Sequence, residues 1–213
     1  MSASRELEQA ARAILPRGIG CAVVPIGQGV LLPAEQAAMA RAVPVRRAEF
    51  AAGRLALRLA MADAGLSFPA NQPILPGADR RPDLPPDHAV SLSHAGGLCI
   101  AIARHGLGIG LGVDIEPHDA IQPDGFCDTI RPYRLKDPRI TPLVAFCAKE
   151  ALFKRQYVTT RRLLDFTAIA VVLNADGRFA GWVDELGLMH GKWAKTASHL
   201  LAISIETESF GLI

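Results

Sequence analysis

The sequence predicts an α+β fold made of two halves that meet near residue 106. Half of the 213 residues are hydrophobic and only 21% are charged, which is typical of a globular chain with a sizeable core. In each half, helical patterns come before runs of strand-forming residues, an order that indicates an α+β arrangement. We therefore expect one half over 1–105 and a second over 106–213.

The first half carries helical patterns followed by a hairpin. The segment "VRRAEFAAGRLALRLAMADAG" (45–65) predicts a long helix that ends at Gly65. The segments "AVSLSH" (89–94) and "LCIAIARH" (98–105) flank a pair of glycines and predict two paired strands. The other expected elements are a helix over 4–15, a strand over 19–26, a short helix in "PAEQAAMARAV" and a loop in "LPGADRRPDLPPDH".

The second half has one long helix and several strands. Residues 107–116 are expected to extend the sheet of the hairpin, and a polar loop over 117–140 follows. The segment "TPLVAFCAKEALFKRQYV" predicts a helix. The segment "FTAIAVVLNADGRFAGWVD" predicts two strands around a turn at Asp176-Gly177, and "HLLAISIET" (199–207) predicts a last strand.

Composition excludes several classes of function. A formal net charge of +2 is too small to indicate nucleic-acid binding, and aromatic residues make up only 6% of the chain. The four cysteines form no C-x-x-C pair, so we expect neither a zinc ribbon nor a dithiol redox site, but reduced thiols in a cytoplasmic protein. The N-terminus does not resemble a secretory signal, and charges and glycines interrupt the longest apolar stretch, so no membrane span is expected. The sequence also contains no G-x-G-x-x-G, Walker A or G-x-S-x-G motif.

Two carboxylates stand out in the predicted strand "GVDIEP". Asp114 and Glu116 are two positions apart, so both side chains point to the same face. Two close carboxylates repel each other, and burying them without a partner is costly. Mg²⁺ would neutralise both, because it prefers oxygen ligands and completes its shell with water and phosphate. The alternative is a strand that reaches solvent where Pro117 ends it.

A second group of charges lies in "FCAKEALFK". Glu150 and Lys154 are four apart and therefore neighbours on one helix face, with Lys149 beside them. They could form an ordinary solvated ion pair. However, the residues around them are apolar almost all round the helix, which indicates burial. Buried charges need partners, and a third carboxylate for a metal with a lysine for a phosphate would provide them.

Two further groups could bind anions. Ser91, Ser93 and His94 end a strand at a glycine turn, where side chains and free N–H groups can face an anion. A structural role for this histidine is the alternative. Along the long helix, three arginines fall on one narrow face, which is either solvated or suited to phosphates. These arginines are Arg47, Arg54 and Arg58.

Together these motifs resemble the 4′-phosphopantetheinyl transferases, specifically the larger surfactin- and enterobactin-synthase type. The resemblance covers roughly residues 45 to 158 and rests mainly on "GVDIE" and "FCAKEALFK", with "SLSH" and "RRAEFAAGRLALRLA" before them. It implies a monomeric pseudodimer of two similar α+β halves, each a small, mainly antiparallel sheet with a packed long helix. Coenzyme A would lie in the cleft between the halves. The sequence departs from the pattern at Leu84, where the family often has Trp, and in the packing residues Phe146, Cys147 and Ala151.

The resemblance also implies an activity and roles for residues. The enzyme would transfer the 4′-phosphopantetheine arm of coenzyme A to a serine of an apo acyl or peptidyl carrier protein, releasing adenosine 3′,5′-bisphosphate. Such carriers serve fatty-acid, polyketide or nonribosomal peptide synthesis. The implied metal ligands for Mg²⁺, or Mn²⁺ as the alternative, are Asp114, Glu116 and Glu150. The implied catalytic residues are Glu150 as general base and Lys154 at the pyrophosphate, and the implied coenzyme A ligands are Arg47, Arg54, Arg80, Ser93, His94, Lys149 and Lys154.

The loop 117–140 and the helix after it are the expected docking surface for the carrier. The loop contains the basic segment "RPYRLKDPR", which suits an acidic partner, although it could equally be a solvated loop. Two other functions compete with this interpretation. One is a metal-dependent phosphohydrolase that acts on coenzyme A or a nucleotide. The other is a catalytically silent coenzyme A-binding module, which the intact carboxylates and Lys154 argue against.

Overall fold

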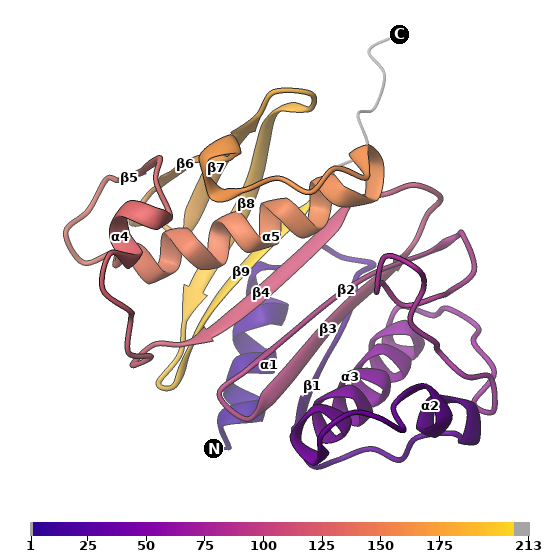
Figure 1. The fold of residues 1–213 in the computed structure, drawn as a ribbon. Coiled ribbons are helices and arrows are strands. Elements are labelled where there is room, and N and C mark those ends of the chain that lie inside the picture. Colours follow the sequence, from indigo (N-terminus) through magenta and orange to yellow (C-terminus); the bar gives the residue numbers. More distant parts are fainter. Residues whose placement is uncertain (1, 207–213) are drawn as a thin grey trace, which may run out of the picture.

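The computed structural model describes residues 2–206 and confirms a mixed α+β fold. Two sheets lie side by side, each with a long helix along it (Figure 1). The elements of the first half are α1 (Ala3–Ile14), β1 (Gly20–Pro25), α2 (Pro33–Ala38), α3 (Pro44–Asp63), β2 (His88–Ala95) and β3 (Leu98–His105). Those of the second half are β4 (Leu111–Pro117), α4 (Phe126–Thr129), β5 (Tyr133–Leu135), α5 (Pro142–Thr160), a 3-10 turn (Phe166–Ala168), β6 (Ala170–Leu173), β7 (Arg178–Val183), β8 (Gly187–Lys195) and β9 (His199–Ile205).

The two sheets differ in size. The first has three antiparallel strands in the order β1-β3-β2, and the second has six in the order β4-β9-β8-β7-β6-β5. Within the second sheet only β5 and β6 pair in parallel. The hairpin predicted at the glycine turn is confirmed as β2 and β3. The near-symmetry of a pseudodimer stays a prediction.

Each long helix covers one sheet and forms a hydrophobic core with it. A further hydrophobic core surrounds helix α1. Helix α3 packs on β1 and β3, and α5 packs on β4 and β9. Helix α1 contacts strands of both sheets, namely β1, β8 and β9. The cluster around it takes buried residues from both halves, including Leu7 of α1, Ile100 of β3, Val113 of β4 and Leu201 of β9. The halves therefore share a continuous core, and the boundary expected near residue 106 stays a prediction.

Several elements differ from those expected. Strand β4 pairs with β9 and starts the second sheet, so the expectation that 107–116 extends the hairpin sheet is wrong. Strand β8 was not predicted, because its burial is irregular and it holds two glycines among polar residues. The short α4 and β5 lie within the expected loop 117–140. The last expected strand is β9, and Thr207 lies outside the described residues.

A glycine on β4 brings α5 unusually close to that strand. A Cβ on Gly112 would lie 1.8 Å from the carbonyl oxygen of Ala151 on α5, a distance that no side chain tolerates. The first sheet repeats the feature, since a Cβ on Gly20 of β1 would lie 2.0 Å from the carbonyl oxygen of Ala60 on α3. The glycine that opens "GVDIE" therefore lets the α5 backbone approach the strand that carries Asp114.

Side chains rather than a backbone ladder join the two sheets. The sheets meet where β2 and β4, an edge strand of each, come into contact. The hydroxyl of Ser91 accepts a hydrogen bond from the Val113 backbone N–H at 3.1 Å. The hydroxyl of Ser93 donates to Oδ1 of Asp114 at 2.7 Å. The alternating serines of "SLSH" therefore fix β4 against the first half. Within residues 2–206, no helix combines the length and apolar character needed to cross a membrane.

Candidate active site

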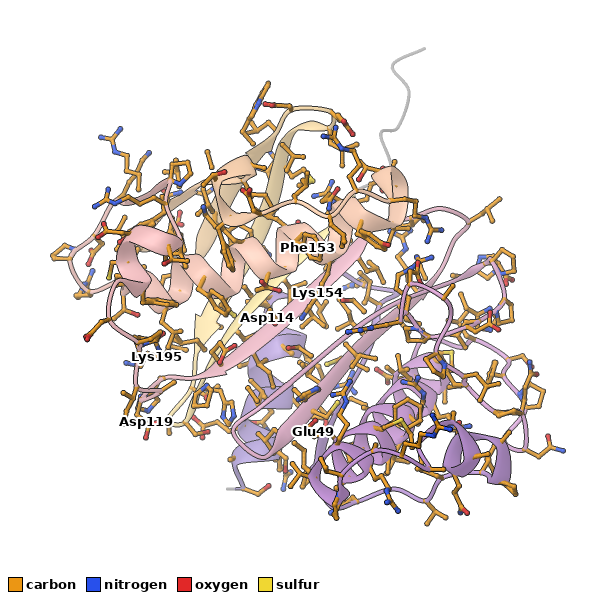
Figure 2. The ribbon with its side chains drawn as sticks, viewed as in Figure 1. Glu49, Asp114, Asp119, Phe153, Lys154 and Lys195 are labelled. Atoms are coloured by element: carbon orange, nitrogen blue, oxygen red, sulfur yellow. The ribbon has the colours of Figure 1, made fainter. Side chains whose placement is uncertain are left out.

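Asp114 is the buried centre of the candidate site. It is 4% exposed, and its Oδ1 accepts hydrogen bonds from Ser93 Oγ and Lys154 Nζ, each at 2.7 Å. Lys154 also donates to the carbonyl oxygen of Val113 at 3.0 Å, and Figure 2 shows it reaching from α5 toward β4. The second carboxylate oxygen of Asp114, Oδ2, is buried and has no hydrogen-bond partner among the described residues. A buried carboxylate oxygen in that state has a place for a further cation or donor.

Two more carboxylates lie close enough to interact with Asp114. Burial, then Asp114 and Glu150, raises the pKa of Glu116 to about 7, although Lys154 opposes this. Burial and Asp114 also raise the pKa of Glu150. Loss of the proton from either carboxyl group would therefore place another negative charge beside that of Asp114. The charges that the sequence placed on β4 and α5 do converge in the fold.

The donor set fits a metal that the substrate helps to bind, rather than a closed protein cage. Among residues 2–206, no group of three or more His, Cys, Asp and Glu side chains is arranged to hold a metal ion. Magnesium commonly takes only one or two protein carboxylates and fills its shell with water and phosphate oxygens. The partnerless Oδ2 of Asp114 matches that requirement. In the structure, the Lys154 ammonium is the cation next to Asp114.

A cavity of about 980 Å³ adjoins this centre. Its walls are α3, the loop 76–86, β2, the connection 106–111 and the end of α5. Lys154 belongs to both the wall and the carboxylate centre, so it connects the two. The other cationic or imidazole side chains of the wall are Arg46, Arg54, Arg80, Arg81, Arg161, His88 and His94. Such a concentration of positive charge suits a ligand with several phosphates.

Arg54 is the most deeply buried cation of the wall. It is 5% exposed, its guanidinium lies 3.8 Å from the centre of the Phe50 ring, and its Nε donates to the carbonyl oxygen of Ile74 at 2.6 Å. Burial lowers its pKa to about 10, although Glu35 raises it in part. Among residues 2–206 no carboxylate forms an ion pair with it, so it favours an anion in the cavity.

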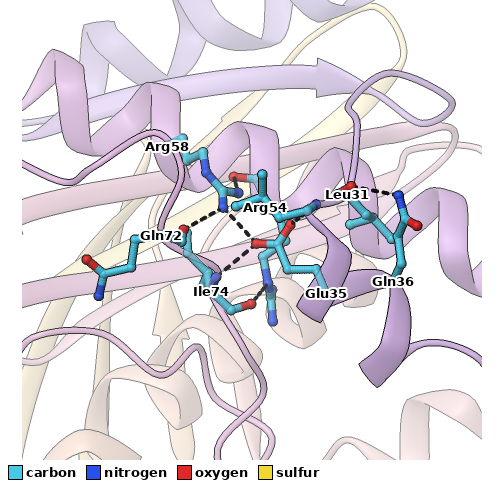
Figure 3. Close-up of polar contacts among 8 residues, drawn as sticks. Leu31, Glu35, Gln36, Arg54, Arg58, Gln72 and Ile74 are labelled. Carbon is cyan, nitrogen blue, oxygen red and sulfur yellow. Dashed lines mark hydrogen bonds and ion pairs between the residues drawn. The ribbon is translucent and has the colours of Figure 1, made fainter.

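Arg58, the third arginine of the predicted stripe, stabilises the fold behind Arg54. Figure 3 shows its guanidinium beside the fully buried Glu35 carboxylate, at 2.7 Å. Glu35 Oε1 also accepts from the backbone N–H of Ile74 at 2.9 Å, and Oε2 accepts from the N–H of Leu32. This network fixes Ile74, whose carbonyl oxygen in turn holds Arg54.

Arg47 and Lys149 lie elsewhere than expected. Arg47 is exposed and donates to the carbonyl oxygen of Ala42 at 2.8 Å, outside the cavity wall. Lys149 is 1% exposed and donates to the carbonyl oxygen of Phe166 at 2.6 Å. Five positions separate Lys149 from Lys154, which puts the two on different faces of α5. Neither Arg47 nor Lys149 is therefore placed to contact a ligand in the cavity.

The remaining predicted coenzyme A ligands differ in whether they line the cavity. Arg54, Arg80, His94 and Lys154 line the cavity. Ser93 is not part of the cavity wall, and its buried hydroxyl donates to Asp114, so its contact with a phosphate stays a prediction. His94 points the other way from Ser93 along β2, and burial, with Arg46 and Lys154, lowers its pKa.

Sequence reasoning missed several charged residues of the wall. Arg46 and Glu49 lie one turn apart on α3, and Asp79 of the loop 76–86 accepts from Arg161 at the end of α5 at 3.0 Å. Arg81 also pairs with Asp79, at 2.7 Å. The basic pair "RR" at 46–47 could have suggested Arg46, but helical spacing alone did not decide between its two members.

Comparisons with known proteins agree with this site. A family model described as the 4′-phosphopantetheinyl transferase N-terminal domain matches residues 34–104. A second, for the 4′-phosphopantetheinyl transferase superfamily, matches residues 110–201. The chain is similar to three relatives, each named as a 4′-phosphopantetheinyl transferase, and the alignments leave about a third of every relative unmatched.

The three relatives come from different bacteria. PptT of Mycobacterium tuberculosis is 36% identical over 160 residues, which cover 71% of this chain and 68% of PptT. Svp of Streptomyces mobaraensis is 34% identical over 69% of this chain and 63% of Svp. Npt of Nocardia iowensis is 33% identical over 63% of this chain and 62% of Npt. The matched segments include both the carboxylate centre and most of the cavity wall, and the chain belongs to the 4′-phosphopantetheinyl transferase superfamily.

Proposed function

We propose that this protein transfers the 4′-phosphopantetheine arm of coenzyme A to a serine of an apo carrier protein and releases adenosine 3′,5′-bisphosphate. The observation that carries the proposal is the position of Lys154. It binds the buried Asp114 and at the same time lines a cavity rich in cations. A ligand with several phosphates in that cavity would reach the carboxylate centre, where phosphoryl transfer needs charge neutralisation.

The cavity wall supports binding of the nucleotide and pyrophosphate of coenzyme A. Arg54 is a buried cation that no carboxylate of residues 2–206 pairs with, and His94 and Arg80 line the same cavity. A cavity of about 980 Å³ lies at the upper end of the usual range for ligand sites, as a ligand of this length requires. Bidentate guanidinium contacts would fix the phosphates.

The proposed metal is Mg²⁺, with Mn²⁺ as the alternative. Asp114, Glu116 and Glu150 would hold it together with phosphate oxygens of the substrate. When bound, such an ion stabilises negative charge on the departing phosphate. Lys154 would then turn from Asp114 to the pyrophosphate, because both groups are within its reach.

Glu150 is the proposed general base. Without a bound cation, burial and Asp114 raise its pKa, and a carboxylate at this position would take the serine proton directly or through a bound water. The carrier serine oxygen would form a bond to the phosphorus that carries the pantetheine arm, and the bond from that phosphorus to the bridging oxygen would break. The serine proton would pass to Glu150, and the electron pair would leave with adenosine 3′,5′-bisphosphate.

The carrier is proposed to dock beside α5, over the basic segment 131–139. Arg131, Arg134 and Arg139 are exposed there, and β5 within it is an edge strand of the second sheet. Exposed positive charge would steer an acidic partner toward the site. We also propose that the enzyme acts as a cytoplasmic monomer. Which class of carrier it serves, fatty-acid, polyketide or peptide, is a matter for the same experiment.

The deciding experiment is intact mass spectrometry of apo carrier proteins incubated with the protein, coenzyme A and Mg²⁺. We expect one carrier to gain a single phosphopantetheine, and chelation to prevent the gain. Glu150→Gln should abolish it, while Glu8→Gln, a change on α1 away from the cavity, should not. Coenzyme A consumed without any modified carrier would indicate the phosphohydrolase instead. Binding of coenzyme A without consumption would indicate the silent module.

A further inference from the structure

Glu49 is a carboxylate in the wall of the cavity, which also holds Asp79 and Asp83 beside the cations that suit a polyanion. It projects from α3, its side chain is 21% exposed, and Figure 2 shows it on the part of α3 that faces β2. A negative charge here repels phosphate groups and lowers affinity for them. Its presence in the wall therefore requires some compensating contact.

Glu49 contacts one of the groups that face the cavity and, through it, a second. Its Oε2 lies 3.0 Å from NH1 of Arg46, whereas Nε2 of His94, at 3.9 Å, is beyond hydrogen-bond distance. The same NH1 lies 3.0 Å from Nε2 of His94. Because a guanidinium can only donate, His94 accepts this bond with Nε2 and carries its proton on Nδ1. The three side chains form one connected group, which we call the Glu49 cluster.

The ion pair of the Glu49 cluster contributes more to the orientation of Arg46 than to the folding stability of the protein. The Arg46 side chain is 54% exposed, and an ion pair that is this exposed contributes only about 0–1 kcal/mol to folding. A free arginine, however, loses up to about 2 kcal/mol of side-chain entropy when a ligand orders it. A carboxylate one helical turn away already restricts Arg46, and so it removes part of that cost before the ligand arrives.

We propose that Glu49 is a positioning residue that holds Arg46 and His94 together on the cavity wall, ready to receive a phosphate group of coenzyme A. The inference rests on the proposed function, and it assigns to Glu49 a role in substrate binding rather than in the transfer step. The arriving phosphate takes hydrogen bonds from Arg46, while Glu49 keeps the guanidinium oriented. Repulsion between Glu49 and the phosphate is the smaller effect, because Arg46 lies between them.

The isosteric change Glu49→Gln separates the two possible effects of this carboxylate. If Glu49 positions Arg46 and His94, the loss of its charge weakens coenzyme A binding. We expect a rise in Kd of about tenfold, equivalent to about 1.4 kcal/mol. If Glu49 only repels the ligand, the same substitution tightens binding. Isothermal titration of the protein with coenzyme A in Mg²⁺ buffer, without a carrier, measures the difference, and Glu8→Gln is the matched control because Glu8 also pairs with an arginine one turn away.

A double-mutant cycle tests whether Glu49 acts through Arg46. We expect Arg46→Ala to weaken coenzyme A binding, and the addition of Glu49→Gln to weaken it by clearly less than Glu49→Gln does alone. In transfer assays, Glu49→Gln should raise KM for coenzyme A about tenfold and leave kcat within about twofold. Unchanged or tighter binding by Glu49→Gln, or fully additive effects in the cycle, would overturn the inference. Failure of the unsubstituted protein to bind coenzyme A would contradict the proposed function itself, so the two failures are distinguishable.

Discussion

The ammonium of Lys154 lies 2.7 Å from Oδ1 of Asp114, next to a serine hydroxyl that donates to the same oxygen at the same distance. The buried aspartate thus has a cationic partner on one oxygen, and its other oxygen has no partner within residues 2–206. Any metal that binds here competes with the lysine for the negative charge of Asp114. We therefore expect binding of the proposed substrate and metal to be coupled, because phosphate would draw the lysine away.

Replacing Lys154 should strengthen metal binding while it weakens catalysis. In Lys154→Met, we expect Mn²⁺ to bind on the order of tenfold more tightly in the absence of coenzyme A, because a nearby positive charge is gone. The melting temperature should fall in EDTA, since Asp114 keeps a buried charge without a partner, and Mn²⁺ should restore part of the loss. Calorimetry checks both results, with the exposed Lys195→Met as control. Equal or weaker Mn²⁺ binding would show that the lysine and the metal do not compete.

Two glycine-to-alanine changes should have opposite effects on stability. Gly112→Ala places a methyl group 1.8 Å from a backbone oxygen of α5, so the helix must move away from β4. We expect a loss of about 2–4 kcal/mol in the free energy of unfolding, together with reduced transfer. Gly53 lies inside α3 with only ordinary contacts at 3.7 Å and beyond, so Gly53→Ala should stabilise the protein by about 0.5–1 kcal/mol. Urea unfolding measures both, and similar values for the two variants would contradict the close approach of α5.

Glu35 should make stability depend on pH in acid. Burial alone would raise its pKa, but the Ile74 N–H, the Arg58 guanidinium and the Leu32 N–H together lower it below the ordinary value of 4.5. A depressed pKa stabilises the fold above the unfolded value, and this contribution is lost as pH falls through the folded pKa. We expect Glu35→Gln to cost about 1–3 kcal/mol at pH 7. The difference from the unsubstituted protein should shrink in urea titrations carried out below about pH 4. A difference that stays constant with pH would contradict this.

Asp79 should anchor the loop 76–86 to the second half. It binds Arg81 within the loop and Arg161 at the end of α5. The Arg161 side chain is 54% exposed, so Asp79→Asn should change global stability by less than about 1 kcal/mol. Amide hydrogen exchange of the loop should nevertheless become faster. Asp137→Asn is the control, because Asp137 pairs only with the nearby Arg139 among the described residues. Unchanged exchange in Asp79→Asn would show that the loop is held by other contacts.

The sequence predicted the elements that carry strong local patterns. The α3 helix ends just before the expected Gly65, the β2–β3 hairpin turns at the expected pair of glycines, and α5 is a long segment that is apolar almost all round. The carboxylates of β4 and α5 do converge. Strand β8 was missed because its residues alternate poorly between apolar and polar. A strand of this kind is defined by its neighbours β7 and β9, which lie on either side of it, and single-sequence patterns carry no such information.

The side chains of the site were harder to predict than its elements. Spacing on a helix gives a face, but it does not say what that face packs against. Arg47 falls on the predicted stripe yet turns to the Ala42 carbonyl oxygen, while its neighbour Arg46 reaches His94. Lys149 belongs to the same motif as Glu150, yet the 3-10 turn after α5 supplies its partner, Phe166. The partners lie five residues from Arg47, 17 from Lys149 and 48 from Arg46, and helical spacing alone does not say which of them a side chain reaches.

The position of β9 has a consequence for how the protein is made. It is the last strand of the described chain, yet it lies between β4 and β8 in the middle of the second sheet. During synthesis, β4 must therefore remain without this neighbour until β9 leaves the ribosome, and pairing between such distant segments is slow. The nascent chain can complete its first sheet earlier, but the strand that carries Asp114 gains this partner only after β9 has been synthesised. A ribosome stalled before β9 would consequently hold a chain whose first sheet is complete while β4 still lacks β9.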